Sequence, residues 1–271
     1  MKKTIISIIT FLFVVIMSST AIQASASGGA TAEFNRDNLD RGIISIKYSS
    51  PNTAKKAKVL IDFGEQRYQY NIKNGGSFVN FPLPLGNGTY KIGVYEQIED
   101  TQYVQVTATS VNLNLNDSSK VFLISHQLID WGVKMNTVIL AKGLTKNKST
   151  ENEKIEVCYQ YMIQQFSYDF VKMKSVQYDY IPVIDEILKK KLGICYDYSA
   201  VFASMLRSQG IKCKLIMGYT SKVKEYHAWN EVFMNDAWIV VDTTFDSQMY
   251  ANKVQYDFEK SRNDYKQSYE Y

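Results

Sequence analysis

The sequence predicts two domains, an all-β domain followed by an α+β domain, in a chain of 271 residues. Three observations support this prediction. Between residues 33 and 124 apolar residues alternate with polar ones, as in half-buried strands. From about residue 150 the apolar spacing becomes helical, and three strand-like runs follow residue 211. With 45% hydrophobic and 21% charged residues, the composition is that of a globular protein.

Residues 1–26 have the features of a secretory signal peptide. Lys2 and Lys3 precede an apolar run over residues 5–17, and Ala24-Ser25-Ala26 supplies small residues for a cleavage site. The run is shorter than the roughly 20 residues that span a bilayer. We therefore expect cleavage, and a mature chain that is secreted, extracellular or associated with the cell wall, with no membrane attachment.

Charge and cysteine content exclude several classes of protein. The predicted signal holds two of the 31 basic residues and none of the 27 acidic ones, so the mature chain has a net charge of +2. This balance argues against nucleic-acid and anionic-membrane partners. Three cysteines, Cys158, Cys195 and Cys213, leave at least one thiol unpaired within the chain. The sequence has no histidine cluster, CxxC pair or calcium loop, so we expect no metal and no cofactor.

Residues 30–124 are expected to form a small β-sandwich of immunoglobulin-like type. Turn clusters such as Lys73-Asn74-Gly75-Gly76 space the strands closely enough for antiparallel hairpins. Asn87-Gly88-Thr89 matches a glycosylation sequon, but Asn-Gly between strands is a frequent hairpin signal, so we expect a turn there. The alternating runs include Ile44-Ile46-Tyr48, Tyr68-Tyr70-Ile72 and Tyr90-Ile92-Val94.

Residues 125–150 are expected to bridge the two domains, partly as a helix, and residues 151–250 to form the α+β domain. Thr150 and Glu153 make a capping box, which predicts that a helix begins there. Its apolar face includes Cys158, so this thiol is expected to be a buried packing residue. The remaining expected elements are a helix over 195–208, strands over 212–219, 226–233 and 238–245, and a C-terminal tail over 251–271.

Cys195 is the candidate nucleophile, because it lies at the predicted start of a helix. The unpaired N–H groups and positive dipole end of a helix favour a thiolate, and the Cys195 backbone N–H can also face an oxyanion. Gly193 suits a close approach of the chain to this helix. Asp197 would oppose the thiolate if its carboxylate pointed at the sulfur, so activation requires a basic partner.

The partner has to be one of two histidines, since the chain contains only His126 and His227. A cysteine nucleophile normally needs a histidine to accept and return a proton. His227 lies in the same predicted domain as Cys195, so it is the better candidate. If Asn235-Asp236 is a two-residue turn, Phe233 pairs with Trp238 and His227 pairs with Thr244. Asp242 then shares a face of the hairpin with His227, as its diagonal neighbour. Asp242 can then orient the imidazole.

Three segments together resemble the motifs of the transglutaminase-like core. They are Gly193-Ile194-Cys195-Tyr196-Asp197-Tyr198-Ser199-Ala200, His227-Ala228-Trp229-Asn230-Glu231-Val232 and Trp238-Ile239-Val240-Val241-Asp242-Thr243-Thr244. The resemblance covers about residues 151–247 and implies a papain-like thiol fold. It also implies Cys195 as nucleophile, His227 as base and Asp242 as the orienting acid. The N-terminal half is similar only at the level of fold to the sandwich that precedes such cores in secreted bacterial proteins.

The sequence therefore supports two hypotheses of different kinds. The first is a secreted transglutaminase-like cysteine acyltransferase, or a cysteine peptidase or amidase. It would act on carboxamide or peptide bonds of proteins or cell-wall peptides through an acyl-thioester. The alternative is a catalytically inactive transglutaminase-like protein for envelope adhesion or binding. Cys158 and Cys213 are expected in the core, with a disulfide between them as the lesser possibility. The acyl donor, the acceptor and the oligomeric state stay open.

Overall fold

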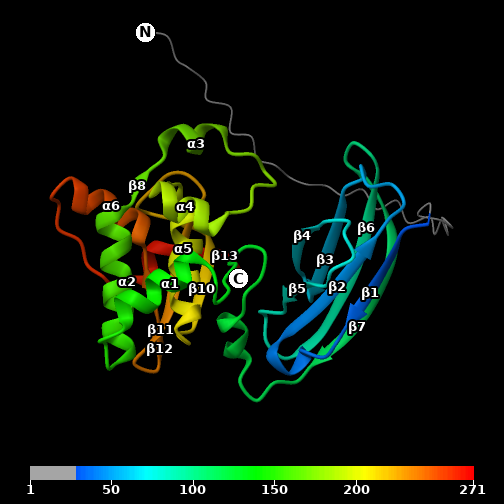
Figure 1. Cartoon of the computed structure of the whole chain (residues 1–271), viewed down its shortest axis with the longest axis horizontal. Coiled ribbons are helices and arrows are strands. Elements are labelled where there is room, and N and C mark those ends of the chain that lie inside the picture. The colour runs from blue at the N-terminus through cyan, green and yellow to red at the C-terminus, as the bar shows by residue number, and fades with distance from the viewer. Residues whose placement is uncertain (1–28) are drawn as a thin grey trace, which may run out of the picture.

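The computed structural model describes residues 29–271, so the predicted signal peptide lies outside the described residues. An all-β domain and an α+β domain lie side by side, with the C-terminus between them (Figure 1). No helix within residues 29–271 is long and apolar enough to cross a membrane.

The N-terminal domain consists of two antiparallel sheets that share one hydrophobic core. Alternate side chains point inward, as the period of two in the sequence requires: Val59 and Ile61 are buried whereas Lys58 and Leu60 are only partly so. One sheet has the order β1-β2-β5 (Thr31–Asn35, Ile43–Ser49 and Val79–Pro82). The other has the order β4-β3-β6-β7 (Gln66–Ile72, Ala57–Phe63, Gly88–Glu99 and Gln102–Leu113). A 3-10 helix, Leu39–Arg41, precedes β2.

The C-terminal domain packs its helices on a four-stranded antiparallel sheet of order β12-β11-β10-β13. The buried helix α5 (Cys195–Ser208) lies against β10 and β11 (Figure 1). The strands are β10 (Cys213–Thr220), β11 (His227–Met234), β12 (Ala237–Val241) and β13 (Tyr265–Glu270). The other helices are α1 (Asn136–Thr145), α2 (Glu151–Gln165), α3 (Phe170–Ser175), α4 (Ile184–Lys190) and α6 (Thr243–Ala251). Short segments complete the domain: β8 (Ser167–Tyr168), β9 (Leu192–Gly193) and the 3-10 helices Ser118–Leu123 and Arg262–Asp264.

The helix starts in this domain follow the local sequence signals. The Thr150 hydroxyl accepts a hydrogen bond from the backbone N–H of Glu153, and the Glu153 carboxylate accepts one from the Thr150 backbone, which confirms the capping box. Helix α5 begins at Cys195 as predicted. All three cysteines are free, so the disulfide between Cys158 and Cys213 does not form.

The segment expected to bridge the domains contains α1, which packs against α2, α4 and α5. Helix α1 therefore belongs to the C-terminal domain. Its N-terminus is held by Asp185 on α4, whose carboxylate accepts hydrogen bonds from the backbone N–H groups of Asn136 (2.8 Å) and Thr137 (2.9 Å). Burial would raise the pKa of Asp185, but these hydrogen bonds lower it below its ordinary value.

Two expectations for the C-terminal half were wrong. The strand expected over 238–245 ends at Val241, because the Asp242 carboxylate accepts from the Phe245 backbone N–H and thereby caps α6. The segment expected as a tail forms β13, which pairs antiparallel with β10 from Thr220↔Tyr265 to Ile216↔Glu270. Most side chains of β13 are exposed or half-buried, which explains why no core pattern marked it as a strand.

Candidate active site

Cys195 is the first residue of α5, and the chain approaches it through a confined turn. A Cβ atom added at Gly193 would lie 2.6 Å from the Cβ of Asp197, so only glycine fits there. The Asp197 carboxylate turns back to accept from the Ile194 backbone N–H at 2.9 Å. Cys195 is partly exposed, whereas Cys158 and Cys213 are buried and their burial raises the pKa of each thiol to about 12. Cys195 is thus the accessible thiol of the three.

The carboxylate of Asp197 is occupied by other partners and does not act as a free negative charge. Lys172 lies 2.5 Å from one of its oxygens and forms an ion pair with it. The Tyr180 hydroxyl donates to the other oxygen at 2.6 Å. The fully buried Asp197 therefore has a hydrogen-bonded cation beside it, which weakens the opposition to a Cys195 thiolate that the sequence had suggested.

His227 and Asp242 form a buried, directly hydrogen-bonded pair. The distance from His227 Nε2 to Asp242 Oδ2 is 2.8 Å, and the two residues are only 5% and 0% exposed. Asp242 accepts two further hydrogen bonds, from the Phe245 backbone N–H (2.9 Å) and the Tyr265 hydroxyl (3.0 Å). Burial alone would raise the pKa of Asp242, but His227 and these donors lower it below its ordinary value.

Cys195 completes the constellation, because its side chain interacts with that of His227 and contributes to the shift in the pKa of His227. Because Nε2 faces Asp242, Nδ1 is the imidazole nitrogen left for the sulfur. Burial lowers the pKa of His227, but the charge of Asp242, the hydrogen bond with Asp242 and the interaction with Cys195 outweigh burial and raise the pKa to about 10. The direction of this shift favours the protonated imidazole.

The hairpin register accounts for most of this geometry, and helix α6 accounts for the rest. Asn235 and Asp236 both have positive φ, at 52° and 61°, as a two-residue type I′ turn requires. The predicted pairing of Phe233 with Trp238 is confirmed. The pairing of His227 with Thr244 does not form, because the strand ends before it. Asp242 reaches His227 as the N-terminal cap of α6 rather than as a diagonal strand neighbour.

His126, the other histidine, has a different setting. It is buried beside Arg207, and burial together with the charge of Arg207 lowers its pKa well below the ordinary value. Its backbone makes an isolated bridge with Ile129. The choice of His227 over His126 as the partner of Cys195 therefore agrees with the contacts of the structure.

Sequence reasoning missed the contribution of the C-terminal segment. Tyr265 on β13 donates to Asp242 and packs its ring on Trp229, with ring centroids 5.0 Å apart. Lys260 lies 2.7 Å from the buried Asp246, one turn along α6 from Asp242. Arg262 pairs with Glu231 on β11. No local pattern links these residues to the hairpin, because the pairing of β13 with β10 is a long-range contact.

The His227–Asp242 pair is expected to contribute less to the free energy of unfolding as the pH becomes alkaline. The raised pKa of His227 means that protonation favours the folded state. The contribution is full below the unfolded pKa of about 6.5 and is lost as pH rises through about 10. The difference in free energy of unfolding between the wild type and His227→Gln should therefore shrink between pH 6.5 and pH 10. Urea denaturation at several pH values measures it, and a pH-independent difference would contradict the pairing.

Residues 139–243 match the family model described as the transglutaminase-like superfamily. A human protein named kyphoscoliosis peptidase is 24% identical over 148 residues, which make up 51% of this chain and 22% of that protein's length. The C-terminal domain of this chain therefore contains a region, residues 139–243, that is similar to the transglutaminase-like superfamily.

Two solved structures are also similar to this chain. A proposed cysteine protease from Cytophaga hutchinsonii is 12% identical and superposes with a TM-score of 0.42, covering 70% of this chain and 64% of that one. The periplasmic domain of TgpA from Pseudomonas aeruginosa is 14% identical with a TM-score of 0.38, covering 75% of this chain and 72% of that one.

Proposed function

We propose that this protein is a thiol acyltransferase or hydrolase that acts on carboxamide or peptide bonds of proteins or cell-wall peptides. The observation that carries the proposal is the contact series from Cys195 through His227 to Asp242. A nucleophile, a proton carrier and an orienting carboxylate in this order are the arrangement that nucleophilic catalysis needs. Cys195 is the nucleophile, His227 is the general acid and base, and Asp242 orients His227.

The proposed reaction has two halves. The Cys195 thiolate attacks the carbonyl carbon, and the resulting C–S bond and oxyanion form a tetrahedral intermediate. The C–N bond then breaks, and the His227 imidazolium donates its proton to the departing ammonia or amine. In the second half an amine or water attacks the acyl-thioester while His227 takes a proton from it. The C–S bond breaks and the Cys195 thiolate is restored. Amine gives cross-linking, and water gives deamidation or proteolysis.

Export and an immunoglobulin-like N-terminal domain are parts of the same proposal. The features of residues 1–26 support export to the cell exterior or the cell wall. Seven strands in two antiparallel sheets around one core support the immunoglobulin-like assignment. Three free thiols are compatible both with release to the cell exterior and with attachment to the cell wall.

A product assay tests the function. Glutamine-containing proteins and wall peptides are incubated with the wild type or Cys195→Ala, with and without a labelled primary amine. Amine incorporation with ammonia release identifies a transferase, ammonia alone a deamidase, and new peptide N-termini a peptidase. Equal product formation by Cys195→Ala would refute a thiol mechanism. If no product forms and iodoacetamide labels Cys195 no faster than a model thiol, the alternative of an inactive binding protein holds.

Tyr265→Phe is expected to lower kcat about tenfold with little change in KM. The hydroxyl donates to a charged carboxylate, and such hydrogen bonds contribute about 1.5–3 kcal/mol, part of which the two remaining donors of Asp242 retain. Without this donor Asp242 binds the imidazolium more strongly, so the alkaline limb of the pH–rate profile should move upward. Tyr219→Phe, at a 56% exposed tyrosine, is the matched control. A lower kcat with an unshifted profile would contradict this positioning role.

A further inference from the structure

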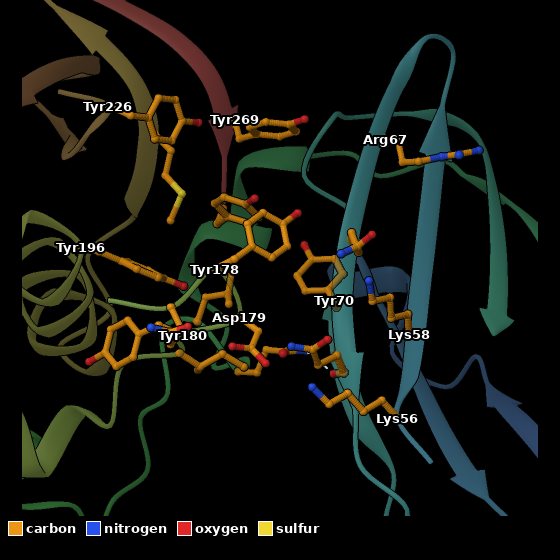
Figure 2. A pocket seen from close by; sticks show the side chains of 18 of the residues that line it. Lys56, Lys58, Arg67, Tyr70, Tyr178, Asp179, Tyr180, Tyr196, Tyr226 and Tyr269 are labelled. Carbon is orange, nitrogen blue, oxygen red and sulfur yellow. Dashed lines mark hydrogen bonds between the residues drawn. The ribbon is translucent and has the colours of Figure 1, made fainter. Parts of the chain in front are cut away.

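A cavity of about 450 Å³ lies between the two domains, on the side of the α+β domain where β13 forms the sheet edge (Figure 2). Strands β3 and β4 of the sandwich make one wall, through residues such as Lys58 and Tyr70. The loop over 177–181, the first turn of α5 and β13 make the other. Its volume is in the range of small-molecule sites, about 300–1,000 Å³.

The lining is polar and aromatic, unlike a hydrophobic core. Of the nineteen residues that line the cavity, eight are tyrosines and only three have aliphatic side chains. Tyrosine offers a flat apolar face together with a hydroxyl that donates and accepts hydrogen bonds. The side-chain amides of the lining belong to Gln69, Asn71, Gln127 and Gln177. A ligand that fits this wall must carry many hydrogen-bonding groups and flat C–H faces.

Cations are concentrated on the sandwich wall. Lys56, Lys58 and Arg67 line it, against a single acidic residue, Asp179, on the opposite wall. Arg67 is paired with Asp62 at 2.6 Å, and Lys58 lies over the ring of Tyr103 at 4.5 Å. The two lysines leave an excess of positive charge, which favours a ligand with a carboxylate or another anionic group.

One buried hydroxyl in this lining lacks a partner. Tyr70 is 2% exposed, and its hydroxyl has no hydrogen bond to any residue within 29–271. Its ring projects from β4 into the space between the domains (Figure 2). A buried hydroxyl left unpaired is unfavourable, so such groups in native proteins call for an explanation. A bound polar ligand would supply the partner.

The cavity adjoins the candidate active site along the chain. Tyr196 and Tyr226 line it, and they are the neighbours of Cys195 and His227. Tyr180 also lines it and donates to Asp197, which is hydrogen-bonded to the turn before Cys195. A ligand in the cavity would therefore contact residues that adjoin Cys195 and His227 in the chain.

We propose that this interdomain cavity binds a short oligosaccharide that carries carboxylate groups. A pyranose ring has a C–H face that stacks on tyrosine and a rim of hydroxyls that the amides and tyrosine hydroxyls can bind. The lysines match its carboxylates. Few aliphatic side chains line the cavity to hold the apolar residues of a peptide, so a saccharide fits better. Binding does not require the thiol, so the inference is independent of the acyl-transfer chemistry.

Titration calorimetry on the mature chain carrying Cys195→Ala tests the proposal. The probes are tetragalacturonic acid, neutral chitotetraose and an acidic Asp-Gly repeat peptide of equal charge. Tetragalacturonic acid should bind more tightly than the other two, and its affinity should fall as salt is added. Lys58→Gln and Tyr103→Ala should each lower the affinity about fivefold or more, since each removes one side of the Lys58–Tyr103 pair. Tighter binding of the peptide, or no binding of either saccharide, would overturn the proposal.

Two variants that each remove one hydroxyl distinguish an effect on ligand binding in the cavity from an effect on the stability of the fold. Tyr70→Phe removes the unpaired hydroxyl, so it should leave the melting temperature unchanged or raised and weaken tetragalacturonic acid about two- to tenfold. Tyr90→Phe, outside the cavity, removes a hydroxyl that donates to the Gly86 carbonyl at 2.9 Å. It should lower the melting temperature and leave the affinity unchanged. Equal affinities for Tyr70→Phe and the parent would overturn the assigned role of this hydroxyl.

Discussion

Replacing Cys195 with alanine is expected to lower the rate of acyl transfer by about 10⁴-fold or more, since removal of the nucleophile from a catalytic triad has effects of this size. The fold should persist, because Cys195 is partly exposed at the start of α5 and its side chain fills no core position. The measurement is kcat/KM on the substrate found by the product assay, with circular dichroism as the check on folding.

The two buried cysteines supply matched controls for this experiment. Cys158→Ala and Cys213→Ala should retain acyl transfer while losing some stability, because both thiols are fully buried packing residues. Iodoacetamide followed by peptide mapping should modify Cys195 first in the native protein. If a fully folded Cys158→Ala variant lost its activity, or if iodoacetamide modified Cys213 before Cys195, the assignment of Cys195 as the nucleophile would be contradicted.

Replacing Lys260 with methionine is expected to lower the free energy of unfolding by about 3–5 kcal/mol at pH 7.5, because it leaves a buried carboxylate without its cation. Asp246 is fully buried, Lys260 is 8% exposed, and the two groups are 2.7 Å apart. Tyr159 also donates to Asp246, at 2.8 Å. Urea denaturation measures the loss.

The pH dependence of that loss identifies its cause. Burial raises the pKa of Asp246 to about 6 even with Lys260 beside it, and removal of the lysine would raise this pKa further. The carboxyl can then be neutralised by a proton at low pH, so the destabilisation should be smaller at pH 5 than at pH 7.5. The double variant Lys260→Met with Asp246→Asn should recover much of the loss. An equal loss at both pH values would indicate that only packing had been removed.

The parts of the site that are local in sequence could be predicted. Gly193 before Cys195 and the helical spacing after it placed the thiol at a helix start. The Asn235-Asp236 turn set the hairpin register, because a two-residue turn leaves little freedom in the pairing of the strands it joins. With only two histidines in the chain, the position of His227 on that hairpin then singled it out.

The parts that depend on distant contacts could not be predicted. Because Val240 and Val241 precede it, the sequence predicts that Asp242 continues a strand. Aspartate is also a strong helix cap, and in the structure α6 begins after it. The strand β13 pairs with β10, which lies about 50 residues earlier, and its exposed side chains carry no alternating core pattern. The links of Tyr265 to Asp242 and of Lys260 to Asp246 exist only once that pairing has formed.

The position of these supports after Asp242 in the chain sets an order for the assembly of the candidate site. During synthesis Cys195, His227 and Asp242 leave the ribosome before Lys260 and Tyr265, so a growing chain holds the reactive groups before it holds their supports. A chain cut short before residue 260 would retain the nucleophile, but its Asp242 would lack one donor and its Asp246 would lack its cation. The complete site can therefore form only after Tyr265 has been synthesised.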